Sequence, residues 1–89
     1  MIIDSHCHLD FPQFAEDLPG VLDRAEAAGV GRMVTISTRV KNYDTYRALA
    51  ESDPRIFFTV GTHPHNAGEE PDVPAADLVA RAQHPRCVA

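Results

Sequence analysis

Cysteine is scarce in this sequence, and no pair of cysteines has a spacing that indicates a structural role. Only Cys7 and Cys87 occur among the 89 residues, and there is no C-x-x-C pair. Two cysteines cannot build the disulfide framework of a small secreted domain. We expect two reduced thiols, given the cytoplasm as the default compartment of a chain without a membrane or secretory segment.

Long apolar runs and a basic surface are also lacking. No segment approaches the ~20 apolar residues of a membrane-spanning helix, and no basic segment followed by an apolar one opens the chain, so we expect no membrane partner. The formal net charge is -5, from 8 basic and 13 acidic residues. This balance excludes broad, nonspecific coating of nucleic acid, but it allows a nucleic-acid enzyme whose metal ions supply positive charge locally.

Several catalytic signatures are missing too: the P-loop, G-x-S-x-G and G-x-G-x-x-G. No nucleophile has an evident partner base. Water activated by a bound metal ion is the hydrolytic chemistry that remains.

The sequence does contain alternating strand and helix patterns. Apolar, β-branched runs predict strands at 1–6, 32–37, 56–60 and 86–89, separated by helices over 16–29, 42–52 and about 74–82. Asp17 and Asn42 are the expected N-caps, and Gly29 the left-handed stop of the first helix. The residues expected to pack inward are Leu18, Val21, Leu22 and Ala25 in the first helix, Tyr43, Tyr46, Leu49 and Ala50 in the second, and Ala75, Leu78, Val79 and Ala82 in the third.

This order predicts an α/β fold with a parallel sheet and right-handed crossovers. The first units of a (β/α)₈ barrel and a small, open, doubly wound sheet both fit it. Residues 1–89 read as one segment without an interdomain linker, and the last predicted strand has no covering helix after it. We expect the N-terminal βα units of a larger barrel domain.

The stretch DSHCHLD ends the first predicted strand and contains the strongest candidate site. Because side chains alternate along a strand, His6 and His8 share one face, about 6.6 Å apart along the axis, and Cys7 takes the other. Barrel enzymes place their sites at this end of their strands, so we predict that His6 and His8 are metal ligands. Asp4 and Asp10 could orient an imidazole or join the ligands, and Asp10 could equally cap the following turn.

A second histidine pair, His63 and His65 in GTHPHNA, follows the third predicted strand. Pro64 stiffens this loop, and Gly61 lets the backbone pass closely by a ligand. The pair is expected to bind an anionic substrate or to add a metal neighbour.

Other polar residues are weaker candidates. Arg39 and Lys41 could meet a phosphate, but a solvated loop is the favoured interpretation. His84 is expected in a surface loop. An acidic stretch before the third helix is expected to be solvated and not to bind metal; it comprises Glu69, Glu70 and Asp72.

DSHCHLD, GTHPHNA and the βα order between them resemble the TatD family of metal-dependent deoxyribonucleases over essentially the whole of 1–89. The resemblance implies a TIM-like barrel with one or two divalent cations (Mg, Mn or Zn) that hydrolyses phosphodiester bonds, typically in DNA. By the same resemblance, His6 and His8 match the first metal pair, and His63 and His65 match the His-Pro-His loop near the scissile phosphate.

The family's next ligand, a glutamate in a Gly-Glu segment, and its later histidines and aspartate have no counterpart among residues 1–89. We therefore expect the remaining catalytic residues beyond Ala89, and a chain that by itself is inactive and folds poorly or associates. Two alternatives stay open: an amidohydrolase-type C–N or C–O hydrolase, and a non-catalytic metal-binding module.

Overall fold

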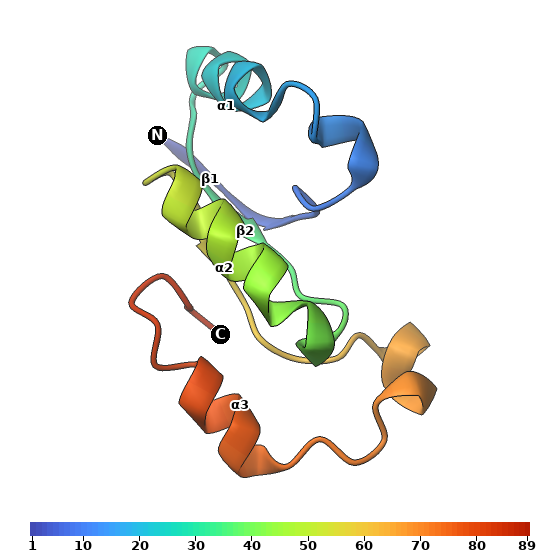
Figure 1. Cartoon of the computed structure of the whole chain (residues 1–89). Coiled ribbons are helices and arrows are strands. Elements are labelled where there is room, and N and C mark those ends of the chain that lie inside the picture. Colours follow the sequence, from blue (N-terminus) through green and yellow to red (C-terminus); the bar gives the residue numbers. More distant parts are fainter.

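A computed structural model describes all residues from Met1 to Ala89 and shows a parallel sheet with helices between the strands (Figure 1). The strands are β1 (Ile2–Cys7), β2 (Val30–Thr35) and β3 (Ile56–Phe58), and they lie side by side in the order β1-β2-β3. Both neighbouring pairs are parallel, as predicted. The second strand begins two residues earlier than the pattern predicted, and the third ends two residues earlier.

The chain end adds the beginning of a fourth parallel strand beside β3. The amide of Phe58 donates to the carbonyl of Arg86 at 3.0 Å, and the amide of Val88 donates to the carbonyl of Phe58 at 3.0 Å. Phe58 and Cys87 form an isolated parallel bridge. The predicted strand at 86–89 is thus confirmed in direction and position, as one bridge and its hydrogen bonds.

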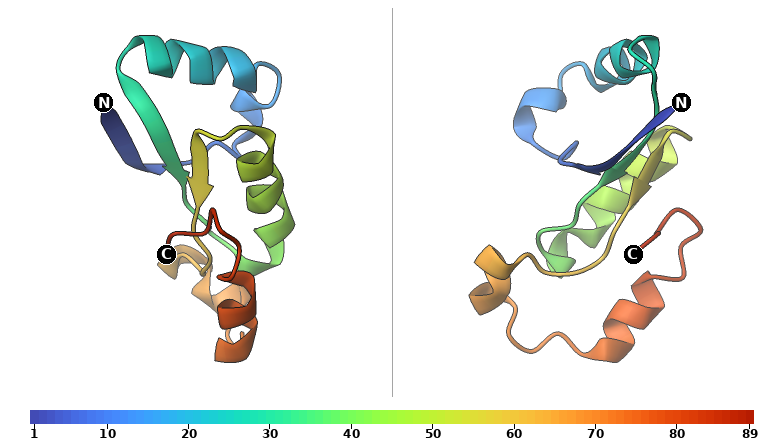
Figure 2. Two further views of the ribbon diagram at one scale, coloured as in Figure 1. Left: turned by 90° about the vertical axis from the view of Figure 1, so that its left-hand side faces the viewer. Right: turned by 180° about the vertical axis from the view of Figure 1, so that it is seen from behind.

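Two helices, α1 (Leu18–Ala27) and α2 (Tyr43–Ser52), lie on the same side of the sheet (Figure 2). Their inward faces follow the predicted spacing, since Leu22, Tyr46 and Ala50 are buried. They join strand residues in one core made of Leu9, Leu22, Met33, Tyr46, Ala50, Ile56 and Phe58. A doubly wound sheet, the other architecture that fits the sequence, would have helices on both faces, and this arrangement is not seen.

The helix ends agree only partly with the predictions. Gly29 has a φ of 100°, which confirms the left-handed stop of the first helix. Asp17 and Asn42 occupy the N-cap positions, but neither side chain makes a capping hydrogen bond, so the prediction of side-chain caps was wrong. A 3-10 turn, η2 (Val40–Asn42), leads into α2 instead, and its amides find a different acceptor described below.

The third helix, α3 (Ala75–Arg81), does not pack as predicted. None of its residues is buried, Val79 is 61% exposed, and Ala75 and Ala82 are also exposed. The helix has only 7 residues and stands at the periphery, where the Tyr43 hydroxyl donates to the carbonyl of Arg81 at 3.0 Å. Helical spacing alone was therefore a poor guide to contact here.

His84 is not the surface loop residue that was predicted. Its side chain is only 16% exposed, and its ring meets Phe58 edge to face with the centroids 5.3 Å apart. Nε2 lies 3.1 Å from Glu51 Oε1, and Nδ1 accepts the amide hydrogen of Arg86 at 3.1 Å. The His84 ring is packed inside because it connects the final segment of the chain to α2 and β3.

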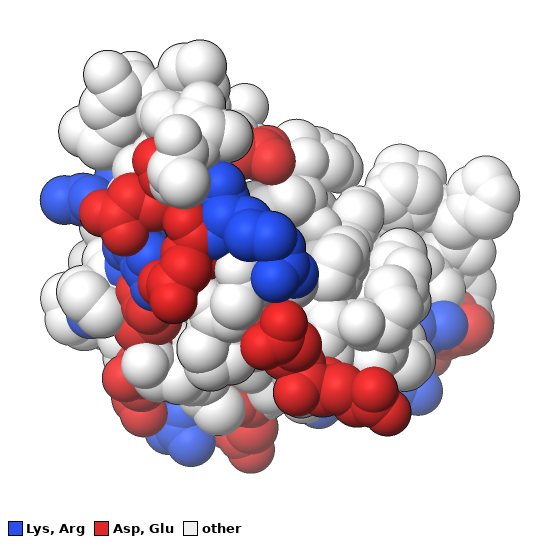
Figure 3. All heavy atoms as spheres, turned by 90° about the horizontal axis from the view of Figure 1, so that it is seen from above, with Lys and Arg blue, Asp and Glu red and all other residues white.

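No helix is long and apolar enough to cross a membrane. On the face seen in Figure 3, acidic and basic side chains are interleaved, in keeping with the net charge of -5. The free edge strand β1 exposes Ile2 and Ile3, by 61% and 58%.

Candidate active site at the carboxyl ends of the strands

The residues after β1 are attached to the end of β2. Leu9 is buried, and its amide donates to Thr35 Oγ1 at 3.1 Å. The amide of Ile36 donates to the carbonyl of Cys7 at 2.9 Å. These bonds hold the backbone on both sides of His8, so the strand pairing itself positions the first histidine motif.

The structure brings His6 and His8 together. Their rings meet edge to face, with the centroids 5.3 Å apart. Phe11 stacks on the other side of His8, at a centroid distance of 4.9 Å and an interplanar angle of 13°. Imidazole nitrogens are ligands for divalent cations, and two rings this close can be directed at one ion.

Cys7 points away from the histidines, as strand alternation predicted. Its side chain packs against the core, and Sγ donates to the carbonyl of Val34 at 3.4 Å. Burial, with the charges of Asp4 and Asp10, raises the pKa of this thiol to about 11. Cys7 is therefore a protonated packing residue and not a metal ligand near neutral pH.

Two buried polar atoms beside the pair have no hydrogen-bond partner: His8 Nδ1 and Asp10 Oδ1. Native proteins rarely leave such atoms unpaired, and both are atom types that bind divalent cations. Asp4 Oδ1 accepts the backbone amide hydrogen of His6 at 3.1 Å, and Asp4 makes no hydrogen bond to an imidazole ring. These donors fit part of a metal site, but residues 1–89 contain no cluster of three potential ligands.

The second histidine pair lies after β3 and opens a 3-10 helix, η3 (Pro64–Glu69), within the stretch predicted to be irregular. The amide of His65 donates to His63 Nδ1 at 3.1 Å, and the two ring centroids are 5.6 Å apart. This bond leaves Nε2 as the free nitrogen of His63, and a neutral ring then carries its proton there. His63 can therefore donate a hydrogen bond to an anion.

Arg39 and Lys41, for which a solvated loop was the favoured interpretation, lie beside the acidic stretch. Arg39 Nε donates to Glu69 Oε2 at 2.6 Å, which raises the pKa of Arg39 and lowers that of Glu69. The backbone amide of Lys41 donates to Glu70 at 2.9 Å. Glu69 is exposed, as predicted, and pairs with Arg39. Glu70 is half-buried and bonded to the loop, so the prediction that it is solvated was wrong.

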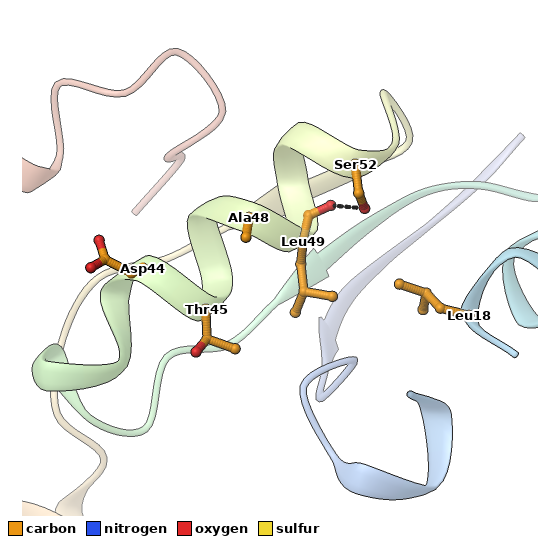
Figure 4. A pocket seen from close by; sticks show the side chains of 6 residues that line it. All are labelled: Leu18, Asp44, Thr45, Ala48, Leu49 and Ser52. Atoms are coloured by element: carbon orange, nitrogen blue, oxygen red, sulfur yellow. Dashed lines mark hydrogen bonds between the residues drawn. The ribbon is translucent and has the colours of Figure 1, made fainter. Parts of the chain in front are cut away.

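The largest hollow lies elsewhere, between α1 and α2 (Figure 4). It has a volume of about 580 Å³ and is lined by Leu18, Asp44, Thr45, Ala48, Leu49 and Ser52. It is open and mainly apolar, contains no histidine, and has one carboxylate. The two histidine pairs lie at the carboxyl ends of the strands and not in this groove, so the groove is not the candidate active site.

Comparison with known proteins decides the family. The profile described as TatD related DNase matches residues 3–89. The chain belongs to the TatD-related DNase family. A protein named "Uncharacterized metal-dependent hydrolase YjjV" from Escherichia coli is 38% identical over 76 residues, which are 85% of this chain and 29% of that protein. The "3'-5' ssDNA/RNA exonuclease TatD" of Enterobacter lignolyticus is 33% identical over 99% of this chain and 34% of its own length.

The crystal structure of YjjV, described as a TatD homologue, superposes on this TatD-family chain with a TM-score of 0.79 at 31% identity. The match covers 99% of this chain and 35% of the YjjV chain. The chain therefore spans about a third of the length of these relatives. Its fold is that of the first βα units of a TIM-like barrel, as predicted.

Two contacts near the carboxyl ends of the strands were not predicted from the sequence. The stacking of Phe11 on His8 had a local signal, since an aromatic residue three positions after a candidate ligand is close enough to touch it. The contacts of Glu70 had no such signal, because its partners Val40 and Lys41 lie 30 and 29 positions away.

Proposed function

We propose that this TatD-family chain contributes two ligands of a metal site and a phosphate-binding loop to a phosphodiesterase. The observation that carries the proposal is the close contact of His6 and His8 beside the unpaired, buried His8 Nδ1. A metal ligand set is the simplest chemistry that uses all of these features at the carboxyl end of a strand.

His6 and His8 hold a divalent cation, and Asp10 orients a ligand or joins the set. A bound cation supplies a hydroxide equivalent near neutral pH and polarises a phosphoryl oxygen. We propose Mg, Mn or Zn, one ion or two. Cys7 takes no part, because its protonated thiol faces the core.

His63 and His65 bind a phosphate oxygen of the substrate. The amide of His65 fixes the ring of His63 so that Nε2 is the donating atom. Glu69 is already paired with Arg39, and Glu70 already accepts backbone amide hydrogens, so neither carboxylate lacks a partner within the protein. We propose single-stranded nucleic acid as the substrate, since relatives are named 3'-5' ssDNA/RNA exonucleases. We propose the cytoplasm as the compartment.

Metal binding by the 89-residue chain tests the first half of the proposal. Isothermal titration with MnCl₂ or ZnCl₂ is expected to show binding that His6→Ala and His8→Ala each weaken by about tenfold or more. His65→Ala is the matched control, because it removes an imidazole from the other pair and should leave metal affinity unchanged. Equal metal affinity in the His8→Ala and unmutated chains would refute the assignment.

Catalysis is tested in a chimaera in which residues 1–89 replace the matching part of Escherichia coli YjjV. The structural match covers 99% of this chain and 35% of the YjjV chain. The chimaera is expected to shorten a single-stranded oligonucleotide only with divalent metal. His63→Ala and His65→Ala should raise KM while metal affinity persists. Cleavage of an amide substrate in place of the oligonucleotide would favour an amidohydrolase instead.

A further inference from the structure

The carboxylate of Glu70 lies between two loops that are distant in sequence. Oε1 accepts the amide hydrogen of Val40 at 2.8 Å and the hydroxyl hydrogen of Thr62 at 2.7 Å. Oε2 accepts the amide hydrogen of Lys41 at 2.9 Å. Val40 and Lys41 begin the turn that leads into α2, where the first amides of a helix lack partners within the helix. Glu70 supplies the acceptor for the first two amides of η2, since the N-cap residue Arg39 offers no side-chain cap.

The same two loops are joined at the other end of the His-Pro-His motif. The amide of His63 donates to the carbonyl of Thr38 at 2.9 Å, and Ser37 Oγ donates to the carbonyl of Gly61 at 2.7 Å. Residues 61–63 are thus tied to 37–38, and Glu70 ties the far end of η3 to Val40 and Lys41. His63 belongs to the first of these attachments, and His65 lies between the two.

Glu70 differs from its neighbour Glu69. Glu69 makes an ion pair with Arg39, and the two side chains are 46% and 33% exposed. Ion pairs at exposed positions contribute little to stability. Glu70 accepts three hydrogen bonds, two of them from backbone amides that have no rotamer freedom to lose. The Thr62 hydroxyl and these amides lower the pKa of Glu70.

We propose that Glu70 is the positioning residue of the His63–His65 pair. Both of its oxygens are engaged within the protein, so it acts through the loop and does not touch the substrate. Removing its charge frees the end of η3 from the start of η2, and the histidines lose their fixed place at the carboxyl ends of the strands. The part of this proposal that concerns phosphate affinity rests on the function proposed above.

Glu70→Gln is the informative substitution, because it keeps the shape and loses one acceptor. A glutamine amide group must face either the Lys41 amide or the Val40 amide and Thr62 hydroxyl, where donor would meet donor. Asp72→Asn is the matched control, since it neutralises an exposed acidic residue two positions away. Both changes alter the net charge equally.

Hydrogen exchange read by mass spectrometry with residue resolution tests the positioning directly, at micromolar concentrations that limit association. Glu70→Gln is expected to speed exchange of the His63 amide by about tenfold, with little change at the Met33 amide, which donates to Arg55 in the sheet at 2.9 Å. Asp72→Asn should change neither. Equal His63 exchange in Glu70→Gln and the unmutated chain would overturn the proposal, and so would equal acceleration at Met33, which marks general destabilisation.

Titration with inorganic phosphate, followed through the ring signals of His63 and His65, tests the functional consequence. Glu70→Gln is expected to weaken the phosphate response by about fivefold or more, whereas Asp72→Asn keeps it. An unchanged response in Glu70→Gln would overturn the positioning role. No response in the unmutated chain would instead refute the phosphate role of the histidines, and the exchange result would still decide whether Glu70 holds the loop.

Discussion

The imidazole ring of His8 stacks on the phenyl ring of Phe11, with the centroids 4.9 Å apart and the planes 13° from parallel. The ring of His6 meets His8 edge to face, at a centroid distance of 5.3 Å. His8 is therefore fixed between a second proposed ligand and an aromatic side chain.

Phe11→Ala is expected to weaken metal binding about tenfold, because the ring of His8 would lose the surface that holds its orientation. Isothermal titration with MnCl₂ or ZnCl₂ measures the effect. Phe14→Ala removes a phenyl ring from the same segment without touching His8 and serves as the control. An identical metal affinity in Phe11→Ala and the unmutated chain would contradict the orienting role.

Arg86→Met is expected to destabilise the chain by about 1–3 kcal/mol. Its Nη1 donates to the carbonyls of Ala50, Asp53 and Ile56 at 3.0, 3.2 and 3.0 Å, and the substitution leaves those acceptors without this donor. Urea unfolding followed by circular dichroism gives the change in free energy of unfolding.

Arg47→Met is the matched control for that measurement. Arg47 pairs only with Asp44 and Glu51 on its own helix, and its side chain is 45% exposed. The loss should be no more than about 0.5 kcal/mol. If Arg86→Met and Arg47→Met lower the free energy of unfolding equally, the carbonyl contacts of Arg86 contribute no more to stability than an exposed ion pair.

Stability is expected to fall when the pH drops from about 5 to 3. The pKa values of Asp53, Glu69 and Glu70 are lowered from ordinary values of 3.8, 4.5 and 4.5, mainly by Arg55, Arg39 and the Thr62 hydroxyl respectively. The unfolded chain then binds protons at a higher pH than the folded chain, so the stabilisation is complete above the ordinary values and is lost below them. Urea unfolding at several pH values measures the slope.

Glu70→Gln should make that slope shallower, because one of the three titrating carboxylates is gone. Asp72→Asn, whose carboxylate is exposed, is the comparison. A slope that stays the same in Glu70→Gln would show that the bonds of Glu70 do not distinguish the folded from the unfolded chain.

Cys7 is expected to react slowly with iodoacetamide in the folded chain. A pKa of about 11, against an ordinary value of 9.0, leaves about a hundredfold less thiolate at pH 8. The chain is alkylated in buffer and, fully unfolded, in about 8 M urea. Mass spectrometry of the peptides then gives the rate of Cys7 alkylation in the folded and in the unfolded chain. Rapid labelling of Cys7 in buffer would contradict its packing against the core.

The parts of the fold that the sequence predicted depend on short-range regularity. Period-two alternation placed His6 and His8 together and turned Cys7 toward the core, and helical spacing identified Leu22, Tyr46 and Ala50 as buried. The His63–His65 contact follows equally from two residues around a proline. Whether these pairs bind metal and phosphate stays a prediction.

The missed features depend on contacts between distant segments. His84 is held by Glu51 and Phe58, which lie 33 and 26 positions earlier, and no local pattern marks it as packed. Val79 had the spacing of an inward residue, but α3 has no layer over that side chain, which is 61% exposed. Sequence periodicity describes one element and does not say which neighbour it will meet.

The fourth strand segment is aligned from two directions, by the Arg86 side chain on three carbonyls and by the backbone of Phe58. Backbone bonds do not depend on which side chains Cys87 and Val88 carry. Inserting one residue between Arg86 and Cys87 would exchange the faces to which the following side chains point. This segment is therefore expected to tolerate substitution far better than a change in length.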